Sequence, residues 1–160
     1  MELTTSEYLE EADEELKRLD HIIFVSLKYT RTVDVIRNAL HRLISTFDVI
    51  IEALLDQALE QKKIEAIPKS PSLRTNLVLE VYPEDKDLLT FMNFYVFLRE
   101  LIKAEYGRRE EYRRHVTMVT PLYGQKTAEI DIDNLETCQK VARQFFDHAR
   151  LVMEGKKEDD

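Results

Sequence analysis

The sequence predicts a mainly α-helical protein: an antiparallel helical bundle of four main helices with a small β-hairpin before the last helix. Three observations predict this fold. Apolar residues recur at alternating spacings of three and four over long stretches, which is typical of helices packed along one another. The 160 residues include only three Gly and four Pro, so few positions interrupt a helix. β-branched residues gather on both sides of one Gly-containing turn, which indicates a hairpin.

A first helix is expected over residues 6–28 and a second, longer helix over residues 32–62. Thr5 or Ser6 can cap the first helix. Because only residues 29–31 join the two helices, we expect them to fold back antiparallel. The predicted buried seams are Leu9, Ala12, Leu16, Leu19, Ile23 and Ser26 in the first helix, and Val33, Ile36, Leu40, Leu43, Phe47, Ile50 and Leu54 in the second.

The third main helix is expected from residue 84 to about residue 106, after a short helix over residues 71–81. Between residues 91 and 98 this helix offers only Asn93 as a polar side chain. One interpretation is that a second copy of the chain covers one side of it, which predicts a homodimer. The other interpretation is a core helix in the middle of the bundle. The predicted dimer interface consists of Phe91, Phe94 and Phe97.

Two runs of β-branched residues, 115–120 and 127–132, predict the hairpin. A pair of strands is marginally stable alone, so we expect it to lie against the helices. A last helix is expected to run through residue 153, with Asp133 or Asn134 as its cap.

Composition and charge exclude several classes of protein. The three glycines stand too far apart for a phosphate-binding loop, and a single cysteine excludes a disulfide framework. No Glu-x-x-His pair or His-Glu-x-x-His motif occurs, so we expect no metal site and no cofactor. We find neither a signal peptide nor an apolar stretch long enough for a membrane span, which favours a cytoplasmic protein without membrane contact.

The net charge of -8 is confined to the two ends of the chain. Residues 1–20 hold eight acids and two basic residues, and residues 154–160 hold four acids and two lysines. The remainder is neutral. We therefore expect one domain over residues 1–160, with a short acidic C-terminal tail over residues 154–160.

The densest basic cluster follows the third main helix. Guanidinium groups bind phosphate through paired hydrogen bonds, and tyrosine rings stack on unpaired bases, so the cluster is a candidate RNA-binding surface. The alternative is an ordinary surface in which nearby glutamates neutralise the arginines. The cluster consists of Lys103, Arg108, Arg109, Arg113, Arg114 and His115, with Tyr106 and Tyr112 between them.

The helical layout, and an Arg separated from a His by four to six intervening residues, resemble the HEPN (higher eukaryote and prokaryote nucleotide-binding) proteins. Arg108 and Arg109 precede His115 at this spacing, and Arg143 precedes His148. The resemblance implies a dimeric helical bundle that binds or cleaves RNA without metal, in some members as a toxin paired with a nucleotidyltransferase antitoxin. It also implies catalysis by His115 as acid or base, with Arg108 and Arg109 stabilising the charged phosphate. Residues expected to bind RNA are Lys103, Tyr112, Arg113 and Arg114.

A noncatalytic alternative fits the same pattern. A dimeric helical adaptor would bind a protein partner and use the acidic N-terminal helix as its contact surface. A small-ligand-binding bundle without turnover is a third class, which the absence of an evident inward polar cluster disfavours.

Overall fold

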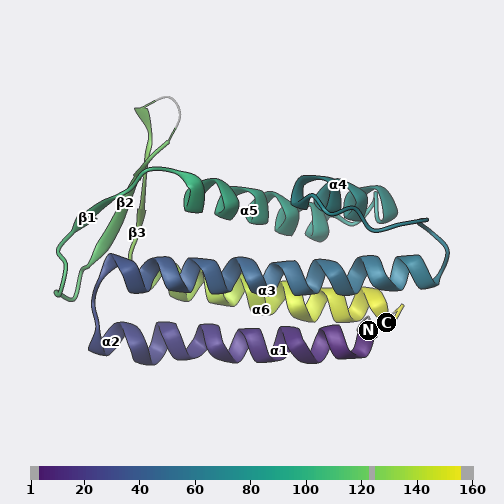
Figure 1. Ribbon diagram of the computed structural model, residues 1–160, viewed down its shortest axis with the longest axis horizontal. Helices are drawn as coiled ribbons and strands as arrows, with labels where there is room; N and C mark the ends of the chain where they lie inside the picture. The colour runs from purple at the N-terminus through teal and green to yellow at the C-terminus, as the bar shows by residue number, and fades with distance from the viewer. Residues whose placement is uncertain (1–3, 123–124, 156–160) are drawn as a thin grey trace.

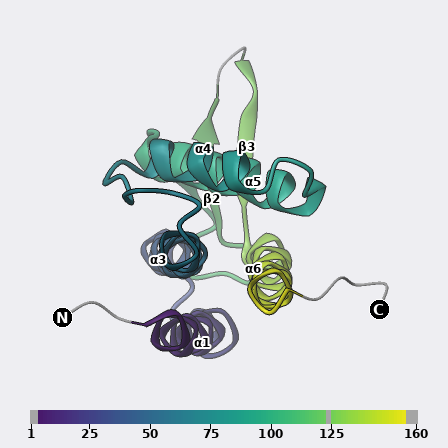
Figure 2. The same cartoon turned by 90° about the vertical axis from the view of Figure 1, so that its right-hand side faces the viewer.

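The computed structural model describes residues 4–122 and 125–155, and in it the three long helices α1, α3 and α6 lie roughly parallel or antiparallel to one another, while α4 and α5 run across them (Figure 1 and Figure 2). The predicted fold class is confirmed: the protein is mainly α, with a small antiparallel sheet before the last helix. The elements in order are α1 (Thr5–His21), η1 (Ile22–Ser26), α2 (Leu27–Tyr29), α3 (Val33–Glu60), α4 (Pro71–Val81), α5 (Lys86–Lys103), β1 (Gly107–Arg109), β2 (Thr117–Pro121), β3 (Thr127–Ile130) and α6 (Ile132–Met153).

The helices form layers around α3. Figure 2, which views the bundle along its length, shows α3 and α6 side by side, with α1 on one side of them and α4 and α5 on the other. This arrangement makes α3 the central helix, and every residue of its predicted seam is buried. Aromatic rings fill the space between the layers. The Phe47 ring centroid lies 4.7 Å from that of Phe145 on α6 and 5.7 Å from that of Phe94 on α5.

The first helix contains a wide turn, which the seam pattern does not predict. Residues of η1 are π-helical, and the Leu27 N–H donates to the carbonyl of Ile22, five residues earlier. One extra residue per turn shifts every later side chain around the helix axis. Leu27 is therefore the buried residue, and Ser26, which was predicted on the seam, is only half-buried.

Side-chain caps mark the starts of α1, α3, α5 and α6, two of them a residue or two from the predicted positions. Thr4 caps α1 in a capping box with Glu7, instead of Thr5 or Ser6. Asp131 caps α6 in a capping box with Asn134, so the predicted cap at Asp133 or Asn134 is wrong. In both boxes the cap oxygen accepts a backbone N–H of the first turn.

The hairpin of β2 and β3 is present, and a third strand joins it. The helix predicted to reach residue 106 ends at Lys103, and β1 pairs antiparallel with β2, with Gly107 opposite Val119 and Arg109 opposite Thr117. β2 lies in the middle of the sheet. The third strand gives the hairpin the additional pairing that an isolated pair lacks.

The apolar stretch of α5 divides between two environments. Phe91 is 9% exposed and packs on Phe145, and Phe94 packs on Phe47, so both contribute to the core of their own chain. Phe97 is 38% exposed. It lies on an uncovered row with Leu89 and Val96. The chain thus buries one side of this helix and leaves the other side open.

Among residues 4–122 and 125–155, no helix is both long and apolar enough to cross a membrane. The described part of the predicted acidic tail consists of Glu154 and Gly155, and the rest of it lies outside the described residues.

Candidate nucleic-acid interface

The basic cluster lies at the end of the bundle where the sheet meets the start of α3 (Figure 1). The loop between β1 and β2 is fixed there by two hydrogen bonds. The Tyr112 N–H donates to the carbonyl of Arg31 at 2.6 Å, and the Val33 N–H donates to the Glu111 carboxylate at 3.1 Å. Tyr112 has a positive φ of 66°. Glu111 adds a negative charge at the positive end of α3, which stabilises both the helix and the loop.

Arg108 and Arg109, the predicted catalytic arginines, both form ion pairs within the chain. Arg108 donates to Asp34 and to Glu111, each at 2.9 Å. Arg109 donates to Glu129 on β3 at 2.7 Å. The hydrogen bond to Asp34 is the main reason that the pKa of Arg108 is raised, and the bond to Glu129 likewise raises the pKa of Arg109. The pairing also lowers the pKa of Glu129.

His115, by contrast, lines a cavity of about 250 Å³ together with three cationic side chains. Lys28 comes from α2, Arg31 from the link before α3, and Arg114 from the β1–β2 loop. Within residues 4–122 and 125–155, none of these three cations forms an ion pair. The Nε atom of Arg31 is buried and finds no hydrogen-bond partner in the described part of the chain. The structure therefore brings His115 to unpaired cations, although not to Arg108 or Arg109.

The opposite wall of this cavity is the start of α6, which carries acidic side chains. Asp131 already accepts the Asn134 N–H at 2.9 Å as the helix cap. Asp133 and Glu136 are the other two carboxylates in the lining. The cavity thus holds both signs of charge: the arginines and lysine favour an anionic ligand, and the carboxylates restrict its size and position.

The remaining predicted RNA-binding residues are spread around this end. Arg113 and Tyr112 are exposed, and Tyr112 is 79% exposed. Lys103 ends α5 and lines a different pocket of about 470 Å³ with Glu100 and Pro121. A tyrosine so exposed is available for stacking on an unpaired base.

The second predicted pair, Arg143 and His148, does not come together. Arg143 faces α1, where its guanidinium lies 3.7 Å from the Asp13 carboxylate. His148 faces the start of α5, where its Nε2 atom lies 2.8 Å from Asp85. Five residues along a helix turn side chains to different faces, and these two face different neighbouring helices.

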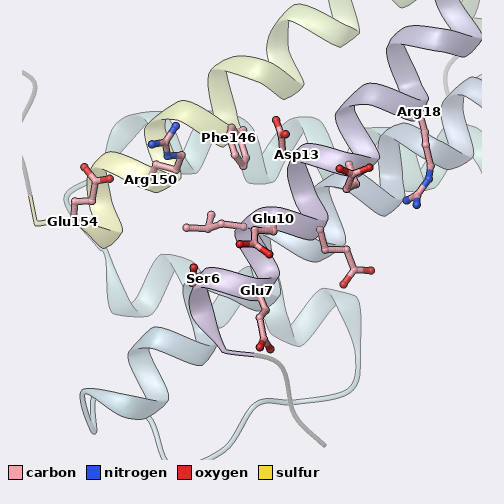
Figure 3. A pocket seen from close by; sticks show the side chains of 11 residues that line it. Ser6, Glu7, Glu10, Asp13, Arg18, Phe146, Arg150 and Glu154 are labelled. Carbon is pink, nitrogen blue, oxygen red and sulfur yellow. The ribbon is translucent and has the colours of Figure 1, made fainter.

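A separate acidic groove lies between the first half of α1 and the last turns of α6 (Figure 3). Its volume is about 790 Å³, and the phenyl ring of Phe146 and the side chain of Leu9 give it an apolar part. The sequence predicts the acidic excess of this helix but not the groove, because Phe146 and Arg150 come from the far end of the chain. The lining residues are Ser6, Glu7, Leu9, Glu10, Glu11, Asp13, Glu14, Arg18, Phe146, Arg150 and Glu154.

Comparison with protein-family models, curated proteins and solved structures gives no match for this chain. The class that the structure itself defines is a mainly α-helical bundle with a cavity of mixed charge at one end and an acidic groove on one side.

Proposed function

We propose that this protein binds single-stranded RNA at the cavity lined by Lys28, Arg31, Arg114 and His115. The observation that carries the proposal is the convergence of three cations, none in an ion pair among the described residues, on one histidine-lined cavity. Guanidinium groups that are not already bonded to carboxylates are available to bind a phosphate through paired hydrogen bonds. Exposed Tyr112 on the same loop supplies a stacking surface for an adjacent base.

Metal-independent cleavage is the enzymatic form of this proposal, and the resemblance to HEPN proteins supports it. His115 would accept the proton of a ribose 2′-hydroxyl as that oxygen bonds to the neighbouring phosphorus, because imidazole is a common general base near neutral pH. The bond from this phosphorus to the 5′-oxygen of the next nucleotide would break, and the 5′-oxygen would take a proton from water, which leaves a 2′,3′-cyclic phosphate and a 5′-hydroxyl. Arg114 would stabilise the additional negative charge on the phosphate. Arg108 and Arg109 contribute to this chemistry only if RNA displaces their partners Asp34, Glu111 and Glu129. A homodimer would bring a second such cavity into the same particle.

Binding is measured by fluorescence anisotropy of a labelled single-stranded RNA at several salt concentrations. Three phosphate contacts predict a slope of about -2 for log affinity against log salt, since each contact on a single strand contributes about -0.7. Lys28→Gln and Arg114→Gln should each weaken binding and make the slope shallower by about 0.7. Lys69→Gln is the matched control, because Lys69 is exposed in the loop before α4, away from the cavity. A slope near zero in the parent protein would rule out this cavity as an RNA site.

Cleavage is tested by incubating RNA with the protein in EDTA. The expected result is cutting by the parent that disappears in His115→Ala and persists in His41→Ala, a control in which an exposed histidine on α3 is removed. Arg109→Ala tests whether the predicted catalytic arginine acts despite its ion pair. Binding without cleavage would restrict the function to RNA recognition.

The acidic groove favours a second candidate function, that of a noncatalytic adaptor. The glutamates of this groove, together with its apolar residues Leu9 and Phe146, match a basic amphipathic segment of a protein partner (Figure 3). A Lys-rich amphipathic peptide should then bind the parent protein and bind the Glu10→Gln, Glu11→Gln double variant more weakly.

The exposed row of Leu89, Val96 and Phe97 supports a homodimer under either function. In sedimentation, Phe97→Asp should convert a particle of twice 18.9 kDa to a monomer.

A further inference from the structure

Three side chains with metal-binding groups meet where the start of α5 approaches the last turns of α6. Asp85 and Asp87 belong to the start of α5, and His148 comes from α6. One ligand atom from each residue can be chosen so that all three lie within 4.8 Å of one another. We propose that Asp85, Asp87 and His148 bind a divalent transition-metal ion such as Zn²⁺.

Asp85 and His148 place two donor atoms side by side. The distance from the Nε2 atom of His148 to the Oδ2 atom of Asp85 is 2.8 Å. Two donors at the usual zinc distance of about 2.0–2.1 Å and the tetrahedral angle lie roughly 3.4 Å apart, so this pair must open by about half an ångström to hold the ion. The other Asp85 oxygen, Oδ1, lies 3.0 Å from the same nitrogen and also accepts the Leu88 N–H at 2.9 Å as the cap of α5, and this bond fixes the carboxylate. Oδ2 remains as the ligand atom.

Asp87 supplies the third donor. Its side chain is 62% exposed, and its Oδ2 atom lies 3.9 Å from Nδ1, the other ring nitrogen of His148, so this carboxylate must rotate to reach an ion held at Nε2. The His148 side chain is only 14% exposed and is fixed by the packing of α6. Two rigid donors and one mobile donor form a site with one nitrogen and two oxygens, a combination suited to zinc, cobalt or nickel.

A cavity beside these residues gives an ion and its remaining water a path to the solvent. Its volume is about 300 Å³, and Asp87 and His148 line it together with Gln144 and Asp147. Three protein ligands leave one position of a tetrahedral zinc ion for water. The ion would replace the proton shared by His148 and Asp85, and that proton would pass to solvent on binding.

The inference is independent of the RNA proposal. Asp133 in the RNA cavity and His148 lie fifteen residues apart on α6, which corresponds to roughly 22 Å along the helix. The sequence does not indicate this site, because Asp85 and His148 are 63 residues apart and form no short motif.

Titration calorimetry with Zn²⁺ tests the site in the full chain. The parent should bind one ion per chain, and His148→Gln and Asp85→Asn should each weaken the affinity about tenfold or more. Asp85→Asn retains an oxygen that can cap α5, which protects the fold. His41→Gln and Glu84→Gln are matched controls, in which an exposed histidine and an exposed glutamate adjacent to Asp85 are removed, and both should bind as the parent does.

A second measurement uses the unaltered protein. On addition of Zn²⁺, the imidazole nitrogen resonances of His148 should shift, and one equivalent should complete the change. If the parent binds no Zn²⁺ at micromolar concentrations, the proposal is wrong and Asp85 with His148 is a structural hydrogen-bonded pair. The same conclusion follows if only the other histidines shift, or if His148→Gln binds as tightly as the parent.

Discussion

Replacing Glu111 by alanine tests whether the loop that carries His115 is held to the bundle by one carboxylate. That carboxylate accepts the Val33 N–H at 3.1 Å and also the guanidinium of Arg108. The change leaves the first N–H of α3 without a charged acceptor and removes a negative charge from the positive end of that helix. A loss of about 1–2 kcal/mol in the free energy of unfolding is expected, a typical cost for a lost cap.

Thermal unfolding followed by circular dichroism measures this loss. For a domain of this length, 1–2 kcal/mol corresponds to a decrease in Tm of roughly 3–6 °C. Glu105→Ala is the matched control, because Glu105 is an exposed glutamate six residues earlier in the chain. Hydrogen exchange should also become faster at the amides of Val33 and Tyr112. An equal Tm for the two variants, with unchanged exchange at Val33, would refute the role given to Glu111.

Three further predictions concern the core and its titrating groups. Phe145→Ala should destabilise the protein by about 3–5 kcal/mol in urea unfolding, because Phe145 is buried against Phe47, whereas the exposed Phe97→Ala should cost far less. Burial raises the pKa of the Cys138 thiol to about 11, so at pH 8 the folded protein should react with iodoacetamide much more slowly than the urea-unfolded chain, and equal rates would contradict the burial. Burial also raises the pKa of the Asp48 carboxyl above its ordinary value of 3.8. The folded state therefore binds the carboxyl proton more tightly than the unfolded state, and the free energy of unfolding falls as the pH rises from 3.8 through the raised pKa. Asp48→Asn should flatten this part of the pH profile while it retains a hydrogen-bonding partner for Tyr95, and an unchanged profile would show that Asp48 does not contribute to it.

Features that depend on periodicity could be predicted from the sequence. The seam of α3 is buried along its whole length, because apolar residues spaced alternately three and four positions apart lie on one side of a helix. The end of α5 could not be predicted in the same way. Residues 104–106 contain no residue type that ends a helix. The chain leaves the helix after Lys103 because β1 pairs with Thr117–Val119, and this contact joins positions that are distant in sequence.

Only part of the candidate site could be predicted from the sequence. The dense run of basic residues in the sequence correctly indicates His115 and Arg114. The same run includes Arg108 and Arg109, which form ion pairs with Asp34 and Glu129, carboxylates that are distant in sequence. Lys28 and Arg31, which complete the cavity, belong to the end of the first helix and the link after it, where no local motif marks them. Spatial proximity decides which cations are neutralised, and a single sequence contains no direct record of it.

The wide turn of η1 connects the register of the first helix to the composition of the cavity. In a regular helix each residue advances about 100° around the axis, and the wide turn takes up one extra residue, so an ordinary α-helical turn made of the same residues would rotate all that follows by roughly that angle. Leu27 would then turn away from the core, and Lys28 would turn away from the cavity that it lines with His115. The wide turn, more than the identity of any one side chain in it, sets which cation reaches the cavity.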